Sequence, residues 1–158
     1  MASKSIVDDK DRSIIKQLQA NARQTISQIA KKTRLPRDVV KYRIDKMEKN
    51  GLIKQYQAII DPTRLGYNLY VYVGFSLHNI TPQEEKSLIG FLVANKNISF
   101  VGKSSGKYDL LIAMCVKDYQ EFDSILRDIR QRFNKVIKEF DATPLIQSYK
   151  YDWLADLI

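Results

Sequence analysis

The stretch T-I-S-Q-I-A-K-K-T-R-L-P-R-D-V-V-K-Y-R-I-D-K-M-E-K-N-G, residues 25–51, predicts two helices joined by a tight turn. Thr25 followed by Gln28 has the spacing of a capping box, in which each side chain bonds a backbone amide of the first turn. Pro36 stands near the start of the second helix, where the amide hydrogen that proline lacks would be unpaired anyway. Gly51 supplies the left-handed residue that commonly ends a helix.

The second predicted helix has one apolar face and one polar face. Its apolar residues recur at helical spacing and are Val40, Ile44 and Met47. The opposite face carries groups that can contact base edges in a DNA groove, which are Arg37, Asp38, Lys41 and Tyr42. A short helix, a tight turn and a longer helix with such groups form the helix-turn-helix pattern, whose second helix enters the major groove. The alternative is a surface helix whose basic face is only solvated.

The positive charge is concentrated in the N-terminal part of the chain. The 158 residues carry a net charge of +8, from 26 Lys and Arg against 18 Asp and Glu. Residues 1–60 hold 14 of these cations and 6 of the acids, whereas residues 61–158 hold 12 of each. This asymmetry predicts a polyanion-binding module joined to an electrically neutral one, and it favours the DNA interpretation.

The composition is ordinary for a globular protein, with 44% hydrophobic and 28% charged residues. The single cysteine, Cys115, excludes an internal disulfide and a cysteine-based metal cluster. No apolar run approaches the roughly 18 residues that a membrane span needs, and the N-terminus lacks the apolar segment of a secretory signal. We therefore expect a cytoplasmic location, no membrane partner and no cofactor.

The N-terminal module gains a first helix, and the chain then becomes extended. Asp8 or Asp9 can cap a helix that runs to about Ala20 and packs behind the helix-turn-helix. After Gly51, the run L-I-K-Q-Y-Q-A-I-I favours a strand or wing, which Asp61 and Pro62 stop. These signals predict three parts: a helix-turn-helix domain over residues 1–52, a linker strand over 53–66 and a second domain over 67–158.

The second domain alternates between strand and helix patterns. Its predicted elements, in chain order, are a strand at 67–78, a helix at 82–95, strands at 98–103 and 108–116, a helix from 119, and a strand at 136–149. Pro144 favours an edge position or a bulge in the last strand. The order β-α-β-β-α-β is that of a ferredoxin-like domain, so the fold class is α+β.

One face of this predicted sheet has no helix to cover it. The strand at 108–116 is apolar on both faces, and Tyr70 and Tyr72 add aromatic surface to the uncovered side. Leaving such a face in water is unfavourable by about 25 cal/mol per Å². We therefore expect a second copy to cover it, and the resulting homodimer would hold two helix-turn-helix units at a fixed spacing.

The chain resembles the Lrp/AsnC, or feast/famine, family of transcription regulators over nearly its whole length. The resemblance rests on five motifs in order, which are D-D-K-D-R-S-I-I-K-Q-L-Q-A-N-A-R at 8–23, I-A-K-K-T-R-L at 29–35, R-I-D-K-M-E-K-N-G-L-I-K at 43–54, D-P-x-x-L-G at 61–66 and G-K-Y-D at 106–109. It departs at Pro36, where the family usually places serine, and in the charged pair that follows. The operator sequence of relatives therefore does not transfer.

The resemblance implies a winged or plain helix-turn-helix, a ferredoxin-like domain, dimers that commonly assemble to octamers, and a small effector, usually an amino acid. The effector would lie near the G-x-Y-D loop, whose candidate residues are Gly102, Lys103, Ser104, Ser105, Gly106, Tyr108 and Asp109, with Thr143 on the last strand. Backbone amides of the turn would face a carboxylate, and Asp109 would take an α-ammonium group. The alternative is a plain hairpin turn in which Tyr108 and Asp109 are structural.

Together these signals predict a sequence-specific, double-stranded-DNA-binding transcription regulator modulated by an amino acid. The alternative is an effector-independent or architectural DNA-binding protein of the same fold. Candidates for phosphate contacts are Thr25, Ser27, Lys31, Lys32, Arg34, Arg43 and Lys54. An enzyme is disfavoured because the lone histidine, His78, has no catalytic partner nearby in sequence. RNA recognition is disfavoured because the strand at 108–116 is aliphatic where RNA-recognition modules place aromatics.

Overall fold

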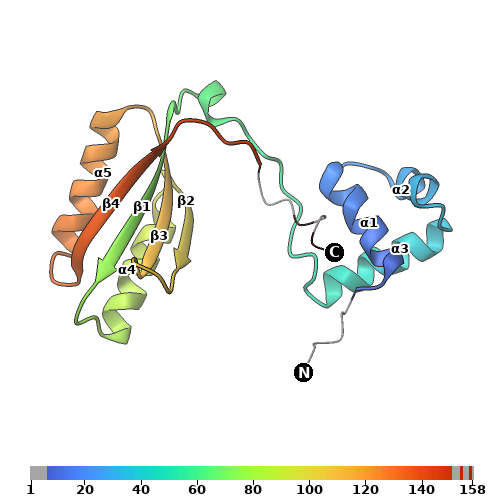
Figure 1. Ribbon diagram of the computed structural model, residues 1–158, viewed down its shortest axis with the longest axis horizontal. Coiled ribbons are helices and arrows are strands. Elements are labelled where there is room, and N and C mark those ends of the chain that lie inside the picture. The colour runs from blue at the N-terminus through green and yellow to red at the C-terminus, as the bar shows by residue number, and fades with distance from the viewer. Residues whose placement is uncertain (1–6, 151–153, 155–156, 158) are drawn as a thin grey trace. The chain divides into compact units, whose positions relative to one another are not determined.

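The computed structural model describes residues 7–150, 154 and 157, and Figure 1 labels its elements. The chain divides into two units, one of residues 1–59 with 149–158 and one of residues 60–148. We call the described part of the first the helical unit and the second the sheet unit. The predicted domains also include residues 1–6 and several residues after 150, which lie outside the described residues.

The helical unit consists of α1 (Asp9–Ala20), α2 (Ile26–Thr33) and α3 (Arg37–Lys49). The predicted apolar face of α3 is buried, and it packs with residues of α1 and α2. The buried residues of this core are Ile14, Ile29, Ala30, Val40, Ile44 and Met47. The core of the helical unit is small, and the buried residues of α3 all lie on one side of that helix.

The predicted helix ends are confirmed. Asp8 caps α1, and its carboxylate accepts hydrogen bonds from the amides of Lys10 and Asp11. Thr25 and Gln28 form the predicted capping box of α2. The turn after α2 contains Arg34 in the left-handed conformation, at a φ of 58°. Gly51 follows α3 with a φ of 77°, the region that glycine adopts without a steric penalty.

The linker strand predicted for residues 53–66 is wrong as to its structure. Residues 54–61 form neither helix nor strand, and Pro62–Leu65 form a 3-10 helix that Gly66 ends. A β-strand needs a neighbouring strand to pair its amides and carbonyls, and no described strand of the chain pairs with this segment. The β-favouring side chains of the run therefore do not by themselves make a strand, and among the described residues this segment is not a paired wing strand.

The sheet unit has the predicted β-α-β-β-α-β order. Its elements are β1 (Leu69–Leu77), α4 (Pro82–Ala94), β2 (Ile98–Lys103), β3 (Leu110–Val116), α5 (Tyr119–Arg132) and β4 (Ile137–Leu145). The four strands are antiparallel and lie in the order β2-β3-β1-β4. Pro144 is therefore on an edge strand, as expected, and β2 and β3 form the predicted hairpin.

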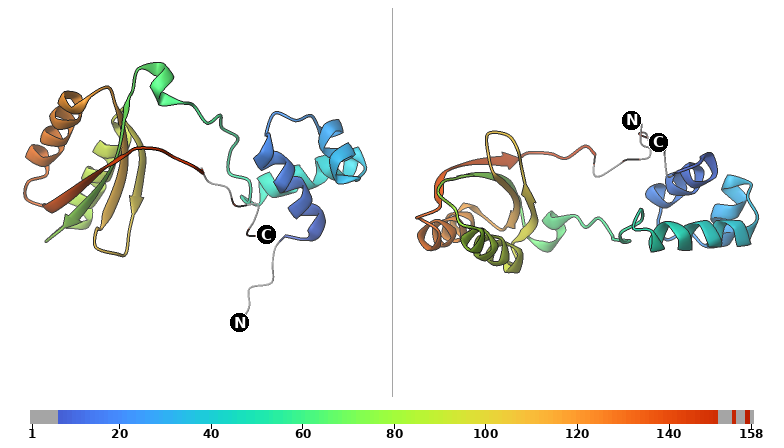
Figure 2. Two further views of the ribbon diagram at one scale, coloured as in Figure 1. Left: turned by 45° about the horizontal axis from the view of Figure 1, so that its top comes forward. Right: turned by 90° about the horizontal axis from the view of Figure 1, so that it is seen from below.

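Both helices of the sheet unit cover the same face of the sheet (Figure 2). The alternate residues of β1 that face them, Val71, Val73 and Phe75, are buried. They pack against Leu88 and Leu92 of α4 and against residues of α5. This confirms the predicted strand at residues 67–78, and no described helix covers the other face of the sheet.

The uncovered face carries large apolar side chains. Tyr72 is 45% exposed and Phe100 is 51% exposed, and Leu111 lies between their strands on β3. The rings of Tyr70 and Tyr72 meet edge to face at a centroid distance of 5.4 Å.

In the described part of the chain, no helix has the length and apolarity to cross a membrane. Within the same residues, no group of three or more His, Cys, Asp or Glu side chains could hold a metal ion.

Candidate DNA-binding interface

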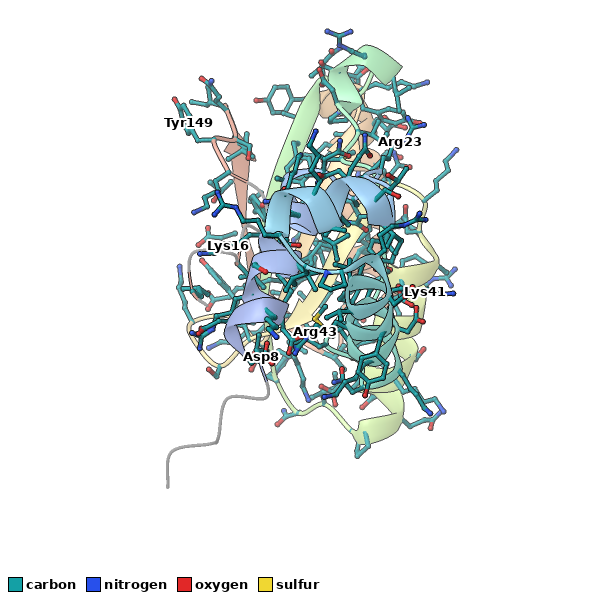
Figure 3. The ribbon with its side chains drawn as sticks, turned by 90° about the vertical axis from the view of Figure 1, so that its right-hand side faces the viewer. Asp8, Lys16, Arg23, Lys41, Arg43 and Tyr149 are labelled. Carbon is teal, nitrogen blue, oxygen red and sulfur yellow. The ribbon has the colours of Figure 1, made fainter. Side chains whose placement is uncertain are left out.

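The exposed face of α3 presents the four predicted groove-contact residues to solvent. Arg37, Asp38, Lys41 and Tyr42 are all exposed, and the Tyr42 side chain has an exposed fraction of 66%. The buried residues of α3 lie on its other side, so the helix orients these four groups away from the core. Figure 3 shows Lys41 on the side of α3 that faces away from α1. A helix exposed in this way can enter a major groove without rearrangement of the unit.

The start of α3 lacks a side-chain cap. Pro36 occupies the N-cap position and makes no capping hydrogen bond. Asp38 lies in the first turn, where its negative charge complements the helix dipole. The amides of this turn therefore receive no hydrogen bond from a side chain at the N-cap.

The predicted phosphate-contact residues differ in their exposure and in the hydrogen bonds that they make within the protein. Ser27, Lys31, Arg34 and Lys54 are exposed, and Thr25 uses its hydroxyl to cap α2. The Lys32 ammonium group donates to Oε1 of Gln24 at 2.6 Å, an exposed contact that a phosphate could replace. These side chains surround α2 and both ends of α3, the elements that border a groove in a helix-turn-helix complex.

Arg43 is held inside the helical unit. Its Nη1 donates to Oδ1 of Asp11 at 2.7 Å and to Oδ2 of Asp8 at 2.8 Å. Figure 3 shows Arg43 and Asp8 pointing toward one another. These hydrogen bonds raise the pKa of Arg43, and the Asp11 amide together with Arg43 lowers the pKa of the Asp8 carboxyl. Arg43 therefore links α3 to α1 and its N-cap through two ion pairs.

The predicted effector residues at 102–109 comprise the end of β2 and the loop that joins it to β3. Hydrogen bonds and an ion pair hold part of this segment in place. Oδ2 of Asp109 accepts a hydrogen bond from the Leu77 amide at 2.7 Å, and the Ser104 amide donates to the Asp109 carbonyl at 2.9 Å. The Lys103 ammonium group forms an ion pair with Glu85 of α4 at 2.6 Å. Of the small candidate residues, Gly102 lies in β2, and Ser105 and Gly106 lie in the loop. Asp109 therefore has a structural bond in addition to any ligand that it holds.

The structure brings Asp141 of β4 beside this loop. Nζ of Lys107 lies 2.7 Å from Oδ2 of Asp141, and the Tyr108 hydroxyl bonds the same carboxylate. Lys107 and Tyr108 both lower the pKa of Asp141. The sequence alone does not predict that Asp141 and Lys107 are neighbours, because only the pairing of β1 with β4 places Asp141 opposite Gly74. Thr143 lies two residues further along the same strand, opposite Tyr72.

Comparison with known proteins agrees with this geometry. Residues 7–54 match the family model described as winged helix-turn-helix DNA-binding. An HTH-type transcriptional regulator from Pyrococcus abyssi is 32% identical over 145 residues, which cover 91% of this chain and 94% of that protein. The chain belongs to the Lrp/AsnC family of transcriptional regulators.

Solved structures share the family fold over both units. An AsnC family transcriptional regulator from Agrobacterium tumefaciens has a TM-score of 0.82 at 23% identity and covers 92% of this chain and 94% of its own. A transcriptional regulator from Neisseria meningitidis, solved as a complex with L-Met, has a TM-score of 0.84 at 17% identity and covers 96% and 99%. The chain is accordingly a transcriptional regulator with a DNA-binding helix-turn-helix and the α+β fold of the Lrp/AsnC family.

Proposed function

We propose that this family member binds duplex DNA sequence-specifically through the exposed face of α3, as a homodimer or larger assembly, and that an amino acid modulates this binding. It acts by binding and not by catalysis. The observation that carries the proposal is the exposure of Arg37, Lys41 and Tyr42 on α3. The excess positive charge of residues 1–60 supports it, since such charge attracts the phosphate backbone.

The proposal is tested at Lys41. If Lys41 reads a base, Lys41→Ala weakens binding to the preferred sequence by about 1–3 kcal/mol and relaxes specificity at that position. If Lys41 contacts only a phosphate, binding to all duplexes weakens alike and the salt slope falls by about one. The matched control is Lys16→Ala, which removes an exposed lysine from α1, on another side of the helical unit (Figure 3). Equal effects of both substitutions would refute a role of the α3 face.

Homodimerisation is supported by the uncovered sheet face. Tyr72 and Phe100 expose about half of their side chains there, and β3 adds Leu111. A second copy placed face to face would bury these residues, as sheets do in two-layer packing. Tyr72→Glu should produce monomers in sedimentation equilibrium. Tyr119→Glu, which charges an exposed tyrosine at the start of α5, is the control and should leave the assembly unchanged.

An amino-acid effector is supported by the loop at residues 102–109 and by its carboxylate neighbours. Asp109 and Asp141 supply negative charge for an ammonium group, and the Ser105 amide is the candidate donor to a carboxylate. The two neighbouring amides of the turn are engaged, because that of Ser104 bonds the Asp109 carbonyl and that of Gly106 bonds the Ser104 hydroxyl. The neisserial relative was solved with L-Met, which is consistent with this class of ligand. Calorimetric titration with each of the twenty amino acids is the test. Silence with all twenty would favour the alternative of an effector-independent DNA-binding protein.

A further inference from the structure

The sheet unit contains a cleft that the proposed function does not use. It lies between the C-terminal half of α5 and the first residues of β4 and has a volume of about 630 Å³. Its lining combines polar and basic side chains with two apolar ones, and consists of Arg127, Arg130, Gln131, Asn134, Ile137, Lys138, Glu139 and Phe140. A cleft of this volume is within the range of small-molecule sites. None of the effector-loop residues lines it.

A β-bulge contributes Lys138 to this cleft. In the pairing of β1 with β4, Ser76 is opposite Glu139, whereas the next residue, Leu77, is opposite Ile137. Lys138 is therefore left without a partner across the ladder. Bulges change the direction of a side chain and are over-represented next to functional sites. Pro144, which favours an edge position or a bulge, lies opposite Val71 and not at this register shift.

Two of the three cations that line the cleft, Arg130 and Lys138, are available to a ligand. Arg127 is paired with Asp123, and the Arg130 guanidinium lies over the Phe140 ring at 4.8 Å from its centroid. In the described part of the chain, neither Arg130 nor Lys138 has a carboxylate within ion-pair distance. Arg130 lies in the last turn of α5, where a positive charge interacts favourably with the helix dipole. Lys138 lies on β4, so the helix dipole does not explain its presence in the cleft.

We propose that this cleft binds a phosphate group, with Arg130 and Lys138 as its charged ligands. A guanidinium fixed against an aromatic ring presents its N–H groups in a planar fork that matches phosphate oxygens. Lys138 adds a second positive charge from β4, and the side-chain amides of Gln131 and Asn134 add hydrogen-bond donors. Glu139 is the one carboxylate of the lining, against the three cations Arg127, Arg130 and Lys138, so the lining as a whole is positively charged.

The phosphate could belong to a small phosphorylated metabolite or to the DNA backbone, and two measurements distinguish these sources. The first is calorimetric titration of the full chain with inorganic pyrophosphate. Wild-type protein should bind it, and the double variant Arg130→Gln with Lys138→Gln should weaken binding at least tenfold. The control is the double variant Lys96→Gln with Lys117→Gln, which removes two exposed lysines of the same unit outside the cleft. It should bind pyrophosphate like the wild type.

The second measurement is the salt dependence of duplex DNA binding by the same variants. A metabolite site leaves the salt slope unchanged, whereas a DNA phosphate site lowers it by about one for each lost contact. Loss of pyrophosphate binding in the cleft variant supports the site with either slope. Absence of pyrophosphate binding by the wild type together with an unchanged slope would overturn the proposal. Equal weakening in the cleft variant and in the control variant would also overturn it.

Discussion

The Arg43 guanidinium of α3 lies 2.7 Å from the Asp11 carboxylate of α1, and the same nitrogen also reaches Asp8 at the start of α1. The side chains of Arg43 and Asp11 are 20% and 11% exposed, so this ion pair is largely removed from solvent. It fixes α3 against α1. Because a side chain engaged in this way is not free to bind phosphate, its substitution should affect stability before it affects DNA contacts.

Arg43→Met should lower the free energy of unfolding of the helical unit by about 1–3 kcal/mol, because it leaves the Asp11 carboxylate without its charged donor. Thermal unfolding followed by circular dichroism measures this. Arg37→Met is the control on the same helix: Arg37 is exposed, so its loss should weaken DNA binding with little effect on unfolding. If Arg43→Met unfolded like the wild type and instead weakened DNA binding, Arg43 would be a phosphate contact.

Asp8 should make the stability of the helical unit depend on pH in the acid range. Its pKa is below the usual 3.8 because the Asp11 amide and Arg43 stabilise the carboxylate. A depressed pKa in the folded state contributes stability above the unfolded pKa, and this contribution is lost as the pH falls through the folded value. Asp8→Asn retains a capping side chain but does not ionise. The difference in Tm between wild type and this variant should be constant above about pH 5 and should shrink below pH 4. A difference that is the same at every pH would contradict a role of the Asp8 charge.

Gly74→Ala should destabilise the sheet unit. A Cβ at this position would lie 2.5 Å from the Tyr108 ring, which packs flat over the glycine and bonds Asp141. The ring must move, and such overpacking typically costs about 1–3 kcal/mol. The expected result is a lower Tm of the sheet unit and weaker effector binding.

The matched control for Gly74 is Gly90→Ala. Gly90 lies inside α4, and a Cβ there would have no atom within 4 Å. Because alanine favours a helix interior over glycine by about 0.5–1 kcal/mol, this substitution should raise the Tm. Similar effects of the two substitutions would mean that the contact between Gly74 and Tyr108 does not determine the local structure.

Tyr56 should titrate at an unusually high pH and should order the segment after α3. Its hydroxyl donates to Glu48 at 2.7 Å, and burial together with Glu48 raises the pKa of Tyr56 to about 12. Because the folded pKa is raised above 10, the stabilisation is present below pH 10 and is lost as the pH rises toward 12. Tyr56→Phe should remove one late-titrating phenol from the ultraviolet titration. It should also increase amide hydrogen exchange in residues 52–56, and unchanged exchange would contradict the ordering role.

Local signals predicted most of the fold. The capping box at Thr25 and the apolar periodicity of α3 depend only on residues near in sequence, and these elements appear where expected. The prediction of a linker strand is wrong because a strand requires a partner strand, and residues 53–60 cannot specify that partner by themselves. Side-chain pattern therefore predicts an extended preference and not the pairing that satisfies it.

The parts of the site that sequence could not predict depend on contacts between distant residues. Arg43 has the charge and position of a phosphate contact, and only the packing of α3 on α1 places Asp8 and Asp11 beside it. Asp141 joins Lys107 through the pairing of β1 with β4, and Lys138 reaches its cleft through a bulge. In each case the residue type was visible in the sequence, but its partner was not.

The most direct test of the central claim is the binding of purified protein to duplex DNA from its own upstream region, measured by fluorescence anisotropy at rising salt concentration. The α3 interface predicts tight binding at about 50 mM salt, a linear fall of log K with log salt concentration, and weaker binding to a scrambled duplex of equal length. A protein that binds neither duplex at this salt concentration, or binds both equally at every salt concentration, would contradict sequence-specific recognition by the helix-turn-helix.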